Sequence, residues 1–333
     1  MAAINPDARM EFEDIYAVVA DDFAAVNRFI SARLNSNVPM IREVGDYIVG
    51  SGGKRLRPLV ATLAARAAGY QGDKHIQVAA VIEFLHTSTL LHDDVVDESA
   101  LRRGRPTVNA VWGNAASVLV GDFLISRAFQ LVVEVGDLAL MEILSESTNI
   151  ISEGEVLQLI NCRDPATTEQ RYMRVIHHKT AKMFEAAAET GAVLGSGRNN
   201  VSLRQQLAHY GRHLGIAFQL VDDVLDYSGD AAALGKNIGD DLAEGKPTLP
   251  LIHAMASATA EEAALIRHAI LKGGRDNLDA VLAIIGRCGS LDYAMQQARE
   301  HTRMASEALA VLPDSRYRDA LLALAQQAAT RDS

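Results

Sequence analysis

Proline is missing from three long stretches of the 333-residue chain, and this absence constrains the fold more than any other feature. The eight prolines leave residues 59–105, 107–164 and 166–246 without one. Proline breaks a helix interior, whereas the Ala, Leu and Glu that are frequent here are good helix formers. Apolar residues recur at helical spacing from Leu140 to Leu157, and no persuasive run has the two-residue period of a strand. The sequence therefore predicts an all-α fold.

Nothing in the sequence divides the chain into separate units. Hydrophobic residues make up 49%, enough for a large core, and we find no internal repeat, low-complexity linker or abrupt change of composition. Gly191 and Gly195 lie one helical turn apart and indicate close helix packing, because no strand precedes them as a nucleotide-binding turn would require. We expect a single domain over residues 1–333, with about the first 15 residues disordered.

The composition argues against several kinds of partner. A formal net charge of -10 makes nucleic acid an improbable main partner. Two cysteines, Cys162 and Cys288, build neither a zinc site nor a disulfide framework. The first residues lack the basic and apolar regions of a signal peptide, and the uncharged stretch from Pro106 to Gly121 is too short and too polar to span a bilayer. We expect a cytoplasmic protein without a transmembrane segment.

One acidic pattern occurs twice, as DDVVD at residues 93–97 and DDVLD at residues 222–226. Each copy continues an apolar helical run, and its first and last Asp are four residues apart, which places them on one helix face. Three carboxylates in such a setting are unfavourable without a cation, and carboxylate oxygens suit Mg²⁺. The alternative is a solvated acidic face. Two copies, 129 residues apart (222 minus 93), favour a metal site.

Basic residues lie near both clusters, although the chain as a whole is acidic. A metal-bound diphosphate still carries negative charge, and arginine forks bind phosphate oxygens. The glycine-rich turn before Lys54 is not a P-loop, because Ile48 stands where the first glycine would be and Arg55 follows the lysine. Alone, each basic group would be a surface charge. The groups are GGKRLRP at 52–58, RRGR at 102–105, Lys179-Thr180, Lys236 and Lys246.

In their order along the chain, five motifs resemble those of the trans-isoprenyl diphosphate synthases. They are GGKRLRP, LLHDDVVDESALRRGRPT, HKTA, FQLVDDVLDY and LGKNIGDDLAEGKPTLPL. The likeness runs from about Tyr16 to Arg331 and is greatest to the long-chain bacterial members, the octaprenyl and nonaprenyl diphosphate synthases.

The resemblance implies a homodimer of all-α subunits, each a helical bundle around a central cavity. It implies that isopentenyl diphosphate is joined head-to-tail onto an allylic diphosphate such as farnesyl diphosphate, with about three Mg²⁺ ions per site when substrate is bound. The product would be octaprenyl or nonaprenyl diphosphate, passed to membrane enzymes for quinone side chains.

The resemblance also assigns roles to single residues. The metal ligands it implies are Asp93, Asp97, Asp222 and Asp226, and the other catalytic residues are Asp94, Asp223 and Lys179. The residues it implies for isopentenyl diphosphate are Lys54, Arg57, His86 and Arg103. The residues it implies for the allylic diphosphate are Arg102, Lys179, Thr180, Gln219, Lys236 and Lys246. Neither the resemblance nor the pattern decides between a structural and a supporting role for the acidic segment Glu153–Glu155.

Two small residues before the first cluster predict a long product. Ser88 and Thr89 precede Asp93 by five and four residues, so they lie about one turn down the same helix, roughly 6–7.5 Å along its axis. Short-chain family members carry bulky aromatics near this point, whereas here the path stays open. Alternatively, both residues only pack against a neighbouring helix. The floor that would stop a long chain is assigned to Leu131, Val132 and Leu144.

Two other functions compete with this interpretation. A class I terpene cyclase also ionises prenyl diphosphates, but it usually carries one DDxxD-like motif and a different second motif. A catalytically silent partner subunit would be expected to lose Asp or Arg at these positions, and here all six motif Asp residues are present.

Overall fold

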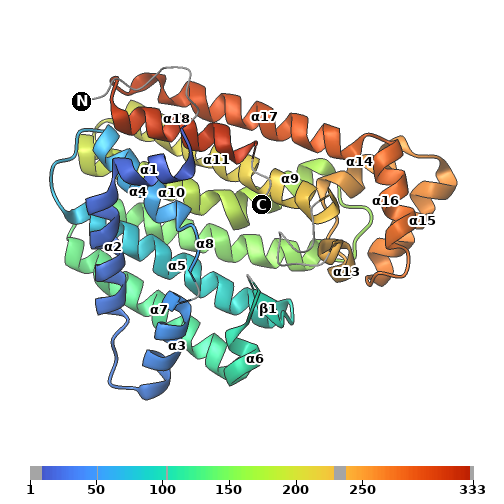
Figure 1. Ribbon diagram of the computed structural model, residues 1–333, viewed down its shortest axis with the longest axis horizontal. Coiled ribbons are helices and arrows are strands. Elements are labelled where there is room, and N and C mark those ends of the chain that lie inside the picture. Colours follow the sequence, from blue (N-terminus) through green and yellow to red (C-terminus); the bar gives the residue numbers. More distant parts are fainter. Residues whose placement is uncertain (1–9, 51, 103, 229–237, 331–333) are drawn as a thin grey trace.

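The computed structural model describes residues 10–50, 52–102, 104–228 and 238–330. Over these residues the predicted all-α fold is confirmed (Figure 1). The strands found there are a two-residue antiparallel ribbon, β1 (Leu101–Arg102) and β2 (Arg105–Pro106), which the sequence pattern did not predict. The helices of the first half are α1 Phe12–Val18, α2 Ala20–Arg33, α3 Pro39–Gly50, α4 Leu56–Ala67, α5 Lys74–Val96, α6 Val108–Trp112, α7 Asn114–Val135 and α8 Leu138–Asn161. Helix α1 already begins at Phe12, inside the segment for which disorder was expected.

The second half of the chain is helical as well. The helices of the second half are α9 Glu169–Ile176, the π-helix η1 His177–Ala181, α10 Lys182–Ser196, α11 Val201–Ser228, α13 Asp240–Glu244, α14 Leu249–Ser257, α15 Ala260–Lys272, α16 Leu278–Arg287, α17 Ser290–Ala308, the 3₁₀ turn η2 Leu309–Val311 and α18 Arg316–Ala328.

Helices α4, α5 and α10 form the centre of the molecule. They pack on one another, with α7 against α5 and α11 against α10, while α17 covers the other side of α11 (Figure 1). Leu59 to Ala65 of α4 and Val78 to Ile82 of α5 are continuously buried. A helix that is apolar all round must be enclosed by others, and this is why these segments lie inside rather than on the surface. The ends of α5 and α11 that carry the acidic clusters therefore project from a rigid core.

Glycine permits a close contact in this core, where α10 lies on α4. A Cβ at Gly191 would lie 2.6 Å from the Cβ of Ala64 and from the backbone nitrogen of Ala65. A Cβ at Gly195 would lie 2.4 Å from the Cβ of Ala68. The close helix packing predicted from these two glycines is thus confirmed.

A single π-helical turn, η1, joins α9 to α10 without a break. Turns of this kind are rare and are often found at functional sites, because they shift the side chains that follow out of the regular helical register. Gly154 of α8 lies directly against this turn, since a Cβ there would be 2.7 Å from the backbone nitrogen of Lys179. The backbone contact presents Lys179 and Thr180 toward the ends of α5 and α11.

Helix α7 is long and apolar enough, by length and composition, to cross a membrane. Its most apolar window has a mean hydropathy of 1.6 and is 44% buried inside the protein, chiefly against α5. A core helix passes the same test, so this property is weak support for a membrane span. The stretch from Pro106 to Gly121 that the sequence singled out covers only the beginning of this helix.

We predict that Gly191→Ala destabilises the protein by about 1–3 kcal/mol, because the added methyl group overpacks the contact with Ala64. The matched control is Gly286→Ala in α16, where a Cβ would meet nothing within 4 Å and helix propensity improves. Denaturant unfolding measures both variants. Equal stability of the two would show that the α4–α10 contact is looser than described.

Candidate functional site

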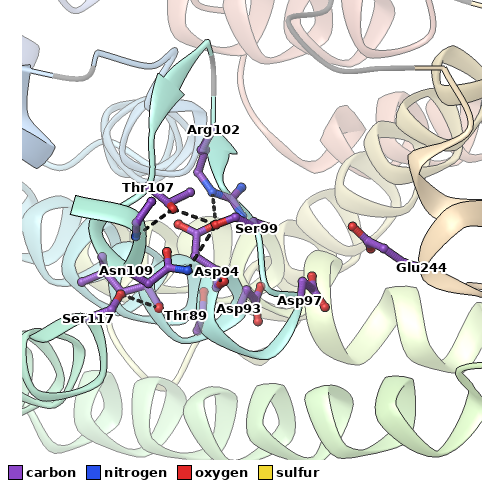
Figure 2. A network of polar contacts seen from close by, with 12 residues as sticks. Thr89, Asp93, Asp94, Asp97, Ser99, Arg102, Thr107, Asn109, Ser117 and Glu244 are labelled. Carbon is purple, nitrogen blue, oxygen red and sulfur yellow. Dashed lines mark hydrogen bonds and ion pairs between the residues drawn. The ribbon is translucent and has the colours of Figure 1, made fainter. Parts of the chain in front are cut away.

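The first acidic cluster lies at the C-terminal end of α5, where Figure 2 shows Asp93, Asp94 and Asp97 along the last turns. Asp97 is the C-cap residue and keeps near-helical torsion angles, φ -84° and ψ 0°. Glu98 then turns the chain with φ 53°. The four-residue spacing of Asp93 and Asp97 therefore places them near one another, as predicted.

Asp94 points away from these two residues and is buried. Its Oδ1 accepts hydrogen bonds from Nε and Nη2 of Arg102, at 2.8 and 2.7 Å (Figure 2). Burial raises the pKa of Asp94, and Arg102 opposes this rise. Asn109 holds the turn from the other side, because its Nδ2 donates to the carbonyl oxygens of Asp94 and Ser99. Arg102, expected at the allylic diphosphate, is thus an ion-pair partner of the cluster itself.

The second cluster lies on the last two turns of α11. Asp223 is buried and accepts hydrogen bonds from the hydroxyl of Tyr172, at 2.6 Å, and from Nε2 of Gln219, at 2.7 Å. Burial raises the pKa of Asp223. The Oε1 of Gln219 accepts in turn from the hydroxyl of Thr180, at 2.9 Å. Gln219 and Thr180, both expected at the allylic diphosphate, are therefore connected to the cluster, and Tyr172 is a contributor that the sequence pattern did not reveal.

Helix α13 and the residues directly after it join the two clusters. The backbone nitrogen of Asp241 donates to Oδ2 of Asp226, at 3.2 Å. The backbone nitrogen of Lys246 donates to the carbonyl of Asp241, and its Nζ donates to Oδ2 of Asp97, at 3.0 Å. Burial alone would lower the pKa of Lys246, but Asp241, Asp97 and Glu244 raise it. Clusters that lie 129 residues apart in sequence (222 minus 93) are thus part of one site.

A second lysine approaches the first cluster from η1. The Nζ of Lys179 lies 3.3 Å from Oδ2 of Asp93 and 2.5 Å from Oε2 of Glu155. Burial raises the pKa of Glu155 to about 7, against the opposing effect of Lys179. Of the acidic segment left undecided by the sequence, Glu155 therefore belongs to the site, whereas Glu153 contacts Asn149 on the surface of α8.

The donor set fits Mg²⁺. Within residues 10–50, 52–102, 104–228 and 238–330, no three His, Cys, Asp or Glu side chains form a ready-made metal cage. Mg²⁺ does not require one, because it commonly takes one or two carboxylates and completes its shell with water and substrate phosphate oxygens. Asp93 with Asp97, and Asp222 with Asp226, offer such pairs.

Two cavities lie on opposite sides of α5. His86 and Asp94 line the first, together with the turn at Gly52 and Arg55. Asp93 lines the second. The remaining lining of the second cavity comes from Leu85, Ser88, Thr89, His92, Ile125, Thr148, Ile151, Ser152, Glu155 and Met183.

Of the residues expected to bind isopentenyl diphosphate, His86 lines the first cavity, and Arg57 contacts His86. Nη1 of Arg57 is 3.0 Å from Nε2 of His86, and its guanidinium lies 4.4 Å from the ring centre of Phe184. Lys54 is exposed, with its ammonium 5.1 Å from the ring centre of Phe12. Arg55, in the same motif but not singled out, lines this cavity as well. The remaining expected residues, Arg103 of this group and Lys236 of the allylic group, lie outside the described part of the chain.

The five residues assigned to product length separate into two groups. Ser88 and Thr89 line the second cavity, beside Asp93. The three assigned to the floor are buried in the main core and line neither of the two cavities; they are Leu131, Val132 and Leu144.

Comparison with known proteins identifies the family. The polyprenyl synthetase family model matches residues 38–285. Octaprenyl diphosphate synthase of Escherichia coli K12 is 54% identical over 97% of this chain and 100% of its own length. The chain belongs to the polyprenyl synthetase family.

Other members of the polyprenyl synthetase family are similar over the full length. The geranyl-diphosphate-specific all-trans-nonaprenyl-diphosphate synthase of Rhodobacter capsulatus is 50% identical over 96% of this chain and 98% of its own. A crystal structure of polyprenyl synthase from Caulobacter crescentus CB15, complexed with calcium and isoprenyl diphosphate, has a TM-score of 0.93 and 42% identity, covering 98% of this chain and 100% of that one. That structure shares the all-helical architecture.

We predict that Arg102→Met destabilises the protein by about 1–3 kcal/mol, because it leaves the buried carboxylate of Asp94 without its ion-pair partner. Adding Asp94→Asn should restore part of the loss. Thermal unfolding measures both variants, with Arg303→Met as the control because Arg303 is an exposed partner of Glu300. A strictly additive double variant would contradict the pairing.

Proposed function

We propose that this chain is a long-chain trans-polyprenyl diphosphate synthase, which adds isopentenyl diphosphate units head-to-tail to an allylic diphosphate. The observation that carries the proposal is the joining of two DDxxD clusters, through Lys246 and Asp241, into one site. Beside that site lies a cavity lined by the small residues Ser88 and Thr89. Full-length similarity to octaprenyl and nonaprenyl diphosphate synthases supports the same function.

The assignment of metal ligands is part of the proposal. Asp93 and Asp97 on one side, and Asp222 and Asp226 on the other, would hold about three Mg²⁺ ions together with the allylic diphosphate. When bound, these ions supply Lewis-acid stabilisation of the negative charge on the leaving diphosphate. Asp94 and Asp223 support the ligands through the hydrogen bonds that hold the two helix ends in place.

The basic residues bind and orient the two substrates. Lys179 and Lys246 lie within reach of the first cluster and meet the charge that grows on the allylic diphosphate as its carbon–oxygen bond breaks. Arg57 and His86 hold isopentenyl diphosphate on the other side of α5, so that its double bond attacks the allylic carbon. The isopentenyl unit then loses a proton to the released diphosphate, and the electrons of that carbon–hydrogen bond form the new double bond. Because the diphosphate leaves as the new carbon–carbon bond forms, no protein nucleophile is required.

The wider biological setting belongs to the proposal as well. We infer a homodimer, because α7 exposes Leu119 and Val133 on its outer side, 67% and 65% accessible, and a second copy would cover them. We further propose a single-domain cytoplasmic enzyme whose product, octaprenyl or nonaprenyl diphosphate, goes to membrane enzymes for quinone side chains.

The decisive experiment incubates the purified chain with isopentenyl diphosphate, farnesyl diphosphate and Mg²⁺, and measures product mass. Long prenyl diphosphates are expected. Cyclic or hydrolysed products without consumption of isopentenyl diphosphate would indicate a terpene cyclase instead. Complete inactivity of the chain alone would indicate a regulatory subunit that needs a partner.

We predict that Asp93→Ala and Asp222→Ala each lower kcat by orders of magnitude while the helical circular dichroism spectrum stays unchanged. The physical reason is that each removes oxygen ligands for the ions that stabilise the leaving diphosphate. The control is Asp279→Ala, an exposed position on α16. Near-normal turnover of either cluster variant with Mg²⁺ present would refute the ligand assignment.

Product length provides a separate prediction. Ser88→Phe and Thr89→Tyr place aromatic rings in the second cavity beside Asp93, so at least one of them should yield mainly short products with turnover retained. Thr87→Tyr is the matched control, because Thr87 faces the first cavity and should leave product length unchanged. Chromatography of the products measures all three. If both cavity variants still make long products, the growing chain takes another route.

A further inference from the structure

Lys179 lies between two carboxylates that belong to different helices. Asp93 of α5 is on one side, 3.3 Å from Nζ, and Glu155 of α8 is on the other, 2.5 Å away. The side chains of Asp93 and Lys179 are 14% and 17% exposed, and that of Glu155 is 30% exposed. The glutamate is therefore the more exposed and the aspartate the more buried of the two partners of the lysine.

Lys246 has the same arrangement, built from different elements. Its Nζ lies 3.0 Å from Oδ2 of Asp97 and also contacts Oε2 of Glu244, the last residue of α13. Figure 2 shows Glu244 approaching Asp97 from the neighbouring segment. Here too the aspartate is the more buried partner, 19% exposed against 33% for the glutamate. A lysine paired with one more buried Asp and one more exposed Glu thus occurs twice around one helix end.

We propose that Glu155 and Glu244 are positioning residues, which keep the two lysines at the diphosphate site when the aspartates exchange their lysines for metal ions. This inference rests on the proposed function, because it requires Asp93 and Asp97 to be ligands. Without an outer partner, a lysine released by its aspartate would be free to turn into solvent, and its long stem would lose conformational entropy again on binding a phosphate oxygen.

The backbone around each glutamate is fixed by contacts that do not involve the lysine side chains. Glu155 follows Gly154, where α8 touches the backbone of η1 so closely that a Cβ would be 2.7 Å from the nitrogen of Lys179. The carbonyl of Glu244 accepts a hydrogen bond from Sγ of Cys162, at 3.1 Å. The next carbonyl, of Gly245, accepts from the backbone nitrogen of Arg163, at 2.8 Å. A rigid support is what a residue that positions another needs.

A competing explanation is that the glutamates only offset positive charge. The two explanations predict different effects of glutamine and leucine. Glutamine removes the charge but keeps an oxygen that accepts a hydrogen bond from the lysine, whereas leucine removes both. If the glutamates position the lysines, the glutamine variants should keep this function and the leucine variants should lose it. If the glutamates contribute only charge, both kinds of variant should lose the function equally.

The test measures binding of inorganic diphosphate with Mg²⁺ by calorimetry, together with the KM of each substrate. In Glu155→Leu and Glu244→Leu, the Kd for magnesium diphosphate and the KM for the allylic substrate should rise about tenfold, the size expected for losing a hydrogen bond to a charged group. The KM for isopentenyl diphosphate should stay the same. Glu155→Gln and Glu244→Gln should stay within about threefold of the wild type.

Matched controls are Glu153→Leu, on the surface of the same helix, and Glu261→Leu, an exposed position of α15; both should bind as the wild type does. A double-mutant cycle with Lys179→Met adds an independent criterion, because Glu155→Leu should have no further effect once Lys179 is gone. Glu155→Ala and Glu244→Ala replace the leucine variants if those do not fold.

Leucine variants with wild-type Kd, or glutamine variants as weak as the leucine ones, would overturn the positioning role while the enzyme remains a synthase. A wild-type chain that neither binds magnesium diphosphate nor elongates a prenyl chain would instead overturn the proposed function and, with it, this inference.

Discussion

The repulsion among carboxylates at the ends of α5 and α11 is the interaction around which the site is built. Six aspartates from two helices belong to one site, and like charges at such short range are unfavourable unless cations or protons compensate them. The structure compensates four of them in three ways. Arg102 pairs with buried Asp94, whereas burial raises the pKa of Asp223. Asp93 and Asp97 instead pair with Lys179 and Lys246, partners that metal ions would replace in the proposed function.

Neighbouring aspartates of the first cluster line different cavities. On α5, Asp93 lines the second cavity and Asp94 the first, because successive residues of a helix point about 100 degrees apart. One helix therefore separates the two cavities and contributes to both. In the proposed reaction, such a wall would hold each substrate on its own side until the reacting atoms meet at the helix end.

Rigid packing behind the site makes this arrangement precise. Gly191 and Gly195 let α10 lie directly on α4, and Gly154 lets α8 lie on η1. The π-helical turn then presents Lys179 to Asp93 and Thr180 to Gln219, with side chains shifted from the regular helical register. Helices whose backbones are in close contact move little relative to one another, so Lys179 and the aspartates keep a defined separation.

The sequence by itself determined the helical class, both acidic clusters and the small residues before Asp93, because helix periodicity and proline placement are local properties that can be read along the chain. Likewise, the contact made by Gly191 and Gly195 was predictable from their spacing. Only the tertiary structure decided that Arg102 pairs with Asp94, that Tyr172 supports Asp223, and that Glu155 and Glu244 flank the two lysines. Tyr172 and Asp223 are 51 positions apart, and Lys246 contacts Asp97 across 149 positions; no local pattern encodes which distant side chains the folded core brings together.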